Sequence, residues 1–407
     1  MQHNNKVNIG LAALLGVLPA LTVTGFMPDI RNLYYVSLSL ICFYAFIKAQ
    51  HIEYIGFIIL AACALSIILG MPDPLFKSWL RLGLFTLVFI ASFPIFQSYR
   101  LILIRELALR FSLMICSVLS VGSFFCFFIG LNFMSINRAE ITDDYISNVG
   151  WFSGLFNHSM TLGPVAGIST VFLFWNARYT FKNHKKWRIF SYICALMSFC
   201  ASLMSASRGA AIGVIISLAV MYFIANKHRI TKLLSALINT AIVLILLLPV
   251  YSPYMDRVMK KQEINVENGG TFASRESRWF HRYEEFIENP VFGCGFSAVY
   301  TNNRSGEYSP VTGGCEPGSS WLAVLSMTGL FGFAGIMYVF VRGVKNSLKI
   351  RNEYHEGYLY LGILTFFMIH LFTEGYIFAG GNYMCLLFWL ICGCGFSSID
   401  EYRLHKQ

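Results

Sequence analysis

The chain has 407 residues, of which 56% are apolar and only 13% are charged, and its mean hydropathy is +0.59. This composition is typical of a polytopic helical membrane protein, because a water-soluble domain this apolar would expose large adhesive patches. The formal charge of +10 does not indicate nucleic-acid binding, since the sequence offers no soluble basic domain that could dock on a duplex. We therefore expect a lipid bilayer, and not nucleic acid, to be the main partner.

Apolar runs recur along the chain, and each is about the length needed to cross a hydrocarbon core of roughly 30 Å. Twelve runs are predicted to span the membrane: Asn8–Phe26, Leu33–Ala49, Tyr54–Met71, Trp79–Gln97, Phe111–Phe133, Trp151–Trp175, Ile189–Met204, Ala210–Ala225, Leu233–Val250, Ser320–Val341, Gly357–Thr373 and Asn382–Phe396. The sequence therefore predicts an all-α polytopic membrane fold of about twelve transmembrane helices.

One long polar stretch, residues 251–319, interrupts the apolar runs and is predicted to form a large loop. If both termini are cytoplasmic, nineteen of the thirty-one lysines and arginines fall on the cytoplasmic side, as the positive-inside rule requires. This arrangement puts the loop outside the cytoplasm. We expect three parts: residues 1–250 with nine spans, the external loop 251–319, and residues 320–407 with three spans and a cytoplasmic tail.

The middle of the loop is predicted to form an amphipathic helix that ends before Pro290. Its apolar face includes Trp279, and its arginines Arg275, Arg278 and Arg282 are spaced to approach one helical face. Three guanidiniums beside a membrane form a good diphosphate site. The alternative is a solvated face on which the arginines pair with neighbouring glutamates.

Arg208, in Ser205-Ala-Ser-Arg-Gly209, lies at the outer end of a predicted span. Its guanidinium could bind phosphate in bidentate fashion, or it could be a snorkelling anchor. Glu316 precedes the helix that starts near Ser320, where it could act as a general base or merely favour the helix dipole. His158, His370 and Glu374 lie in apolar runs, where ionisable groups are functional candidates, although a lone histidine is more often structural.

The sequence shows no Walker motif, no Cys/His spacing for zinc and no Asp-x-Asp pair in an external loop. It therefore predicts neither a metal nor a nucleotide cofactor. Most of the eleven cysteines lie in apolar runs, where a free thiol packs as a small hydrophobe. Cys294 and Cys315 share the loop and could pair in an oxidising compartment, with two free thiols as the alternative.

Several short motifs in chain order resemble the O-antigen ligase and O-antigen polymerase superfamily of bacterial envelope glycan assembly. The motifs that carry the resemblance are Gly154-Leu-Phe-Asn-His-Ser-Met-Thr-Leu-Gly163, Ser205-Ala-Ser-Arg-Gly-Ala210, Arg275-Glu-Ser-Arg-Trp279, Asn289-Pro-Val-Phe-Gly-Cys-Gly295, Ser320-Trp-Leu322 through Thr328-Gly-Leu-Phe-Gly332, and His370-Leu-Phe-Thr-Glu374. The sequence departs from the ligase pattern at one point, because Gly318 stands where ligases usually carry a histidine. Glu316 is the nearest replacement base.

The resemblance implies a GT-C-like, metal-independent, inverting glycosyltransferase in the bacterial inner membrane, with its active side facing the periplasm. It would move a glycan from undecaprenyl diphosphate to a sugar or lipid A-core acceptor. Arg208 and Arg275 would hold the diphosphate, and Glu316 would accept a proton. Arg278, Arg282, Trp279, His158, His370 and Glu374 are the remaining candidates for substrate contact. A polymerase of the same superfamily, a polysaccharide-lipid flippase and a scaffold for other assembly enzymes remain alternatives.

Overall fold

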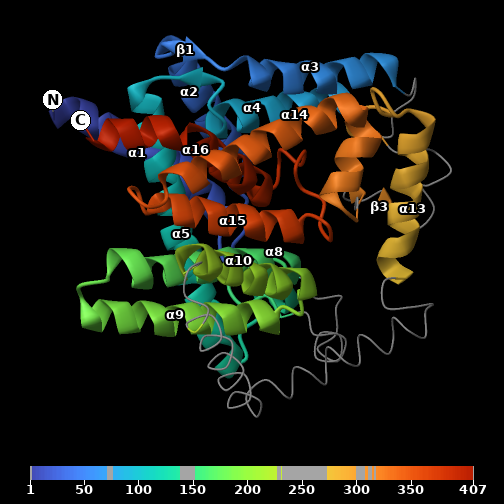
Figure 1. Ribbon diagram of the computed structural model, residues 1–407. Helices are drawn as coiled ribbons and strands as arrows, with labels where there is room; N and C mark the ends of the chain where they lie inside the picture. Colours follow the sequence, from blue (N-terminus) through green and yellow to red (C-terminus); the bar gives the residue numbers. More distant parts are fainter. Residues whose placement is uncertain are drawn as a thin grey trace.

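The computed structural model describes residues 2–70, 77–137, 152–226, 231, 273–298, 308–309, 314–315 and 318–406, which are mostly helical (Figure 1). The helices are α1 (Gln2–Leu21), α2 (Arg31–Ile47), α3 (Tyr54–Leu69), α4 (Ser78–Ser92), α5 (Tyr99–Phe128), α6 (Phe133–Asn137), α8 (Ser159–Trp175), η1 (Asn176–Thr180), α9 (Lys185–Met204), α10 (Arg208–Asn226), α13 (Ala273–Glu288), α14 (Ser320–Ile350), α15 (Glu356–His370) and α16 (Tyr383–Lys406). Two short antiparallel pairs join β1 (His51–Ile52) to β2 (Phe96–Gln97) and β3 (Tyr308–Ser309) to β4 (Gly314–Cys315).

Six of the described helices are long and apolar enough to cross a membrane: Tyr99–Phe128, Ser159–Thr180, Lys185–Met204, Arg208–Asn226, Ser320–Ile350 and Tyr383–Leu404. Four shorter apolar helices correspond to the first four predicted spans. The predicted class, a multi-pass helical membrane protein, is therefore confirmed. The count of twelve spans and the boundary at residue 250 stay predictions, because the run Leu233–Val250 lies outside the described residues.

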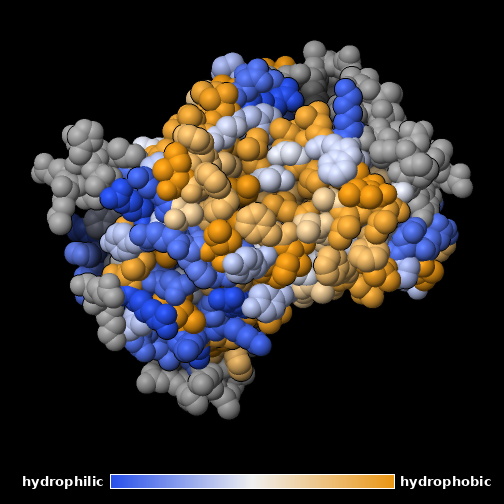
Figure 2. Space-filling model, turned by 90° about the horizontal axis from the view of Figure 1, so that it is seen from above, coloured by the Kyte–Doolittle hydropathy of each residue, from blue (hydrophilic) through white to orange (hydrophobic). Residues whose placement is uncertain are grey.

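Figure 1 shows β1 and both termini at one end of the helices and α13 at the opposite end. We call these the terminal end and the loop end. Figure 2 shows apolar side chains over the middle of one face, between more polar ends. An apolar band between polar ends is the surface that a bilayer requires. The topology predicted from the basic residues would make the terminal end cytoplasmic.

The core is built around α16, whose Trp389 is fully buried. Its indole meets Phe89 and Phe93 of the α4 region edge-on, at ring-centre distances of 4.4 and 6.0 Å. Phe388 packs against Phe367 of α15 in the same way, at 5.3 Å. Edge-to-face aromatic pairs of this kind fix the relative orientation of the helices that they join. The last span therefore holds the shorter helices of the N-terminal half in place.

The structure corrects two predicted boundaries. α5 begins at Tyr99, twelve residues before the predicted Phe111, because Arg105 is buried and donates to the carbonyl oxygens of Ile90, Ala91 and Phe96. These bonds satisfy backbone groups near the end of α4, which otherwise lack helical partners. The second correction is that the helix predicted to begin at Trp151 begins at Ser159 instead. Residues 152–158 precede α8 and are not helical.

Candidate functional site

The segment 290–295, at the end of the amphipathic loop helix, is docked into a break in α14. Four backbone hydrogen bonds of 2.8–3.3 Å join the two, donated by Cys294 to Ser326, Gly295 to Met327, Leu330 to Pro290 and Phe331 to Val291. The segment therefore replaces part of the internal hydrogen bonding that α14 loses at its break. This docking fixes the position of α13 relative to the spans.

Glycines make the docking sterically feasible. Gly329, at the break in α14, has φ 62° and ψ −166°, a conformation essentially reserved for glycine. A Cβ at Gly329 would lie 2.3 Å from the carbonyl oxygen of Val291, and a Cβ at Gly293 would lie 2.4 Å from the carbonyl carbon of Met327. The Pro-x-x-Gly-x-Gly sequence therefore has a steric reason, namely the close approach of two backbones.

The predicted amphipathic helix is confirmed as α13, but its arginines have different surroundings. Arg282 is buried and donates from Nη1 to the Glu285 carboxylate at 2.9 Å, the Ser326 hydroxyl at 3.1 Å and the Ala298 carbonyl at 3.2 Å. Glu285 is fully buried as well. A buried guanidinium with these partners joins α13 to α14, which favours a positioning role over the substrate contact predicted from sequence.

The other side of α13 meets the start of α14. Trp279 donates from its indole Nε1 to the carbonyl oxygen of Gly318 at 3.2 Å. Gly318 has φ 69°, and a Cβ there would lie 3.0 Å from the Cβ of Arg278. Gly318, where the resemblance leads us to expect a histidine, therefore lies against the half-buried Arg278.

The start of α14 is also tied to the connection between α15 and α16. Ser320 donates from its hydroxyl to the Glu374 carbonyl at 2.7 Å, and its amide meets the carbonyls of Leu371 and Glu374 at 2.9 Å each. The amide of Tyr376 donates back to the Ser320 hydroxyl at 2.9 Å. These hydrogen bonds hold the motif His370–Glu374 directly against the first residue of α14.

His370 is fully buried at the end of α15. Its Nδ1 lies 2.8 Å from the Tyr376 hydroxyl, and its ring stacks on Phe366 with 5.3 Å between centres. Burial raises the pKa of Tyr376 well above its ordinary value, so the phenol stays neutral in this pair. His370 therefore supports the connection that carries Glu374, whose side chain is half-buried.

Arg208 begins α10 and is exposed. The turn before it brings Ala206 to φ 55°, and Gly209 lies so close to Thr373 that a Cβ would be 2.3 Å from its hydroxyl. The same turn packs against Gly163 of α8, whose carbonyl accepts a hydrogen bond from Ser202 at 2.9 Å. Arg208 is thus held beside the α15–α16 connection.

His158 is the N-cap of α8, where its Nδ1 accepts a hydrogen bond from the amide of Met160 at 3.1 Å. Nδ1 is therefore unprotonated and Nε2 carries the proton of the neutral ring. This bond stabilises the helix start, as an N-cap side chain does. His158 thus has a structural role within the same group of motif segments.

Two predicted catalytic residues lie wholly or partly outside the described part of the chain. Glu316 lies outside the described residues, and Arg275 lies on α13 with only its backbone described. Their predicted roles therefore stay predictions. Cys294 carries a free, buried thiol, and burial, with a smaller contribution from the nearby Glu285 charge, raises its pKa to about 12. Within the described part of the chain, no group of three or more His, Cys, Asp or Glu could hold a metal ion.

Sequence analysis missed a second polar cluster at the terminal end. Arg110 bridges the carboxylates of Glu106 and Glu356 at 2.8 Å each, and the buried Glu401 accepts from the hydroxyls of Tyr354 and Tyr360. These groups tie α5, α15 and α16 together. The sequence feature that could have indicated this cluster is the four-residue spacing of Glu106 and Arg110, which places both on one helical face.

The fold and this site define a multi-pass membrane protein. Its folding brings together segments that carry arginine, tryptophan, histidine and acidic residues at the loop end. The comparison with known families agrees with this class. A family profile described as O-antigen ligase matches residues 192–337, which include Arg208, the loop helix α13 and the break in α14. The resemblance to the O-antigen ligase and O-antigen polymerase superfamily is therefore confirmed. No curated protein matches the chain.

Proposed function

We propose that the protein is a membrane glycosyltransferase that moves a glycan from undecaprenyl diphosphate to an acceptor sugar. The observation that carries this proposal is the convergence of the motif segments at the loop end. Gly209 contacts Thr373, Ser320 bonds to Glu374, and Trp279 bonds to Gly318. Segments around residues 209, 279, 320 and 374 thus come together, and α13 among them carries arginines, which suit an anionic, membrane-anchored donor.

In the proposed reaction, an acceptor hydroxyl oxygen attacks the anomeric carbon of the first sugar of the glycan. The bond from this carbon to the diphosphate oxygen breaks with its electron pair, so undecaprenyl diphosphate leaves with added negative charge. Arg208 and Arg275 stabilise that charge by bidentate hydrogen bonds, which act strongly where water is partly excluded. A single displacement of this kind inverts the anomeric centre. The proposed chemistry assigns no step to a metal.

The acceptor hydroxyl needs a base, because its pKa is too high for unaided attack. Glu316 is our first candidate, since it lies two residues before the Gly318 position and the start of α14. Glu374 is the rival, because its backbone is bonded to Ser320 and its side chain is half-buried. In either role the carboxylate takes the proton that the acceptor oxygen releases.

A ligase and a polymerase would perform the same displacement on different acceptors. A ligase transfers the finished glycan to a lipid A-core sugar, whereas a polymerase adds the glycan to another repeat unit. Deletion of the gene distinguishes them through the glycan profile of the cell. Loss of every capped acceptor indicates a ligase, and acceptors that carry one repeat unit indicate a polymerase. An unchanged profile would contradict both.

The orientation in the bacterial inner membrane is part of the proposal. The distribution of basic residues favours a cytoplasmic position for Lys182–Arg188 and a periplasmic position for residues 251–319. Reporter fusions at Lys185 and at Glu267 should therefore report opposite sides of the membrane. The same side for both positions would contradict the proposed topology and, with it, a periplasmic transfer site.

A further inference from the structure

A pocket lies at the terminal end, away from the segments that form the candidate transfer site. It encloses about 420 Å³ and opens to the surface, and it is lined by residues from the β1–β2 region, the start of α5, α14 and α16. Its volume is within the range of ordinary ligand pockets, which is about 300–1,000 Å³. The transfer reaction proposed above makes no use of this pocket.

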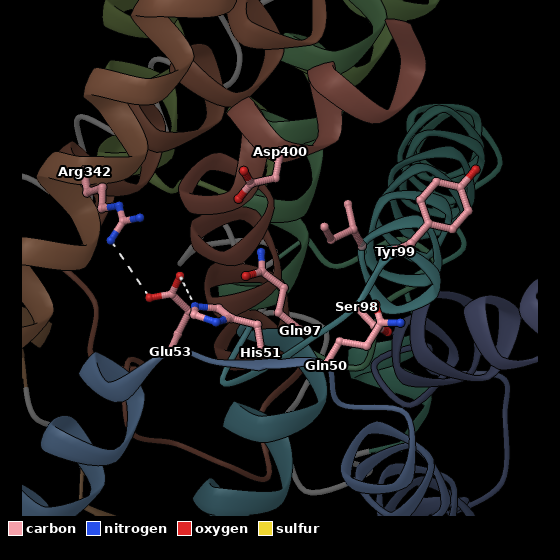
Figure 3. A pocket seen from close by; sticks show the side chains of 9 residues that line it. Gln50, His51, Glu53, Gln97, Ser98, Tyr99, Arg342 and Asp400 are labelled. Carbon is pink, nitrogen blue, oxygen red and sulfur yellow. Dashed lines mark ion pairs between the residues drawn. The ribbon is translucent and has the colours of Figure 1, made fainter. Parts of the chain in front are cut away.

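Two buried polar groups in the pocket have no protein partner. The Nε2 of Gln97 and the Oγ of Ser98 are buried without a hydrogen bond, and these residues are only 7% and 8% exposed. Figure 3 shows the Gln97 amide pointing into the space below Asp400 and beside the pair of His51 and Glu53. Buried donors without partners are costly, so both groups need an acceptor, and a ligand in the open pocket could supply it.

The N-terminus of α5 contributes the partial positive charge of its helix dipole to the pocket. Ser98 is the N-cap residue of this thirty-residue helix, yet its hydroxyl makes no capping bond. The positive end of the helix dipole therefore meets the pocket together with the Gln97 amide. Both features suit an anionic oxygen, such as one of a phosphate group.

The remaining charges of the pocket require that the ligand also carries a cation. Arg342 lies 4.0 Å from Glu53, and His51 lies 3.7 Å from it, so the Glu53 charge is already opposed. Asp400 is half-exposed and pairs with Arg403 only at 3.5 Å. A ligand with phosphate alone would bring a second negative charge beside the Asp400 carboxylate, whereas an amine alone would leave Gln97 without an acceptor.

We propose that this pocket binds the phosphoethanolamine headgroup of a membrane phospholipid. The phosphate oxygens accept from Gln97 Nε2, Ser98 Oγ and the first turn of α5, and the ammonium donates to Asp400. A primary ammonium provides the N–H donors that a carboxylate accepts, whereas a quaternary choline group has none and prefers aromatic cages. The described lining residues include one tyrosine, Tyr99, and no phenylalanine or tryptophan, so they form no aromatic cage.

Apolar side chains around the pocket favour a lipid over a free headgroup. Ile47, Ile52 and Tyr54 lie within three residues of lining residues in the sequence and are 56%, 38% and 73% exposed. Tyr99 is itself a lining residue and is 52% exposed. Tyrosine and aliphatic residues at a span end are typical of the membrane–water interface. Acyl chains can therefore lie on this surface while the headgroup occupies the pocket.

The test compares lipid binding to the purified, delipidated full chain. Short-chain phosphatidylethanolamine, phosphatidylglycerol and phosphatidylcholine are offered at equal concentration, and bound lipid is counted by native mass spectrometry. We expect phosphatidylethanolamine to bind about tenfold more tightly than the other two, the effect of one hydrogen bond to a charged group. Equal binding of the three lipids, or a preference for phosphatidylglycerol, would overturn the proposal.

Variants locate the binding in this pocket. Gln97→Leu keeps the approximate shape and removes an amide without a protein partner, so the chain should fold normally and lose the preference about tenfold. Asp400→Asn should do the same, and Ser98→Ala gives an independent third variant. The matched control is Asp29→Asn, an exposed aspartate that pairs with one arginine and should leave binding unchanged. A preference that survives all three pocket variants would contradict the assignment.

Competition with soluble phosphoethanolamine shows whether the pocket binds a phospholipid or the free headgroup. If the acyl chains contribute, the free headgroup should displace bound lipid only at a concentration at least about tenfold higher than that of the short-chain lipid. Displacement at equal concentration would show that a free zwitterion, and not a phospholipid, is the ligand.

Discussion

The indole of Trp279 donates a hydrogen bond to the carbonyl oxygen of Gly318, 3.2 Å away, and so joins the loop helix to the start of α14. Gly318 in turn leaves room for Arg278, because a Cβ there would lie 3.0 Å from the Arg278 Cβ. The glycine that stands where the resemblance implies a histidine thus lies against the helix that carries Arg278.

Gly329→Ala should release the loop from α14. An alanine would need the glycine-only backbone conformation of Gly329 and would place its Cβ 2.3 Å from the Val291 carbonyl oxygen. We expect a loss of about 1–3 kcal/mol in the free energy of unfolding, together with lost transfer. Thermal unfolding measures the first effect. Gly83→Ala is the matched control, since nothing lies within 4 Å of a Cβ at this helical position.

Alkylation of Cys294 provides a local readout of the same docking. Because burial raises the pKa of this thiol to about 12, the thiolate is scarce at pH 8, and labelling should keep rising as the pH passes 9. In Gly329→Ala the pKa should fall toward the ordinary value of about 8.5, so labelling at pH 8 should increase on the order of 100-fold or more. Peptide mass spectrometry separates Cys294 from the other cysteines. Equal labelling of both proteins would mean that the loop stays docked.

The pair of Arg282 and Glu285 tests positioning against substrate contact. Removing either partner leaves a buried charge, so Arg282→Met and Glu285→Met should each destabilise the protein by about 3–5 kcal/mol. The double variant should recover most of that loss and keep near-normal transfer. A stable double variant that had lost transfer would instead assign Arg282 to the substrate, as the sequence first predicted.

Arg208→Ala should lower transfer by roughly 30–1000-fold while expression is kept, because a charge-assisted contact to the diphosphate is lost. Arg208→Lys should fail as well, since a point charge cannot replace the planar fork. Arg275→Ala should behave like Arg208→Ala. Arg188→Ala, at the start of α9, is the control and should be active. Near-normal transfer in Arg208→Ala would mean that Arg208 is a membrane anchor and does not bind the diphosphate.

Glu316→Gln keeps the shape of the side chain and removes the base. We expect turnover to fall by roughly 100-fold or more with donor binding intact, and Glu374→Gln to have a smaller effect. Steady-state kinetics with both variants makes the comparison. If Glu316→Gln is only slightly less stable and turns over normally, Glu316 is a helix-cap residue worth about 1 kcal/mol, and Glu374 becomes the base.

Much of the fold followed from the sequence because hydrophobic runs and basic residues dominate the physics of a membrane protein. Runs cannot reveal a buried charge, so Arg105 was assigned to a connection although it lies inside α5. The docking of Gly293 against α14 depends on a break at Gly329 that periodicity does not show. Partners far apart in sequence, such as Ser320 and Glu374, also had no local signal.

For the site residues too, the sequence predicted which residues matter but not what each of them contacts. Sequence identified Arg208, Trp279 and His370 as members of motifs, yet it could not tell a buried support from an exposed contact. His158 serves as an N-cap and Arg282 as a buried link, because the fold offers each of them a nearby backbone or carboxylate partner. Arg208 is exposed and remains a candidate for binding phosphate.

The most direct measurement follows both products of transfer in proteoliposomes that contain the purified chain, a lipid-diphosphate glycan donor and an acceptor, without nucleotide or ion gradient. Each glycosidic bond formed should be accompanied by one released undecaprenyl diphosphate, and Arg208→Ala should abolish both signals together. If the donor instead crosses the bilayer with its glycan still attached, the protein is a transporter, and the proposed transfer site is wrong.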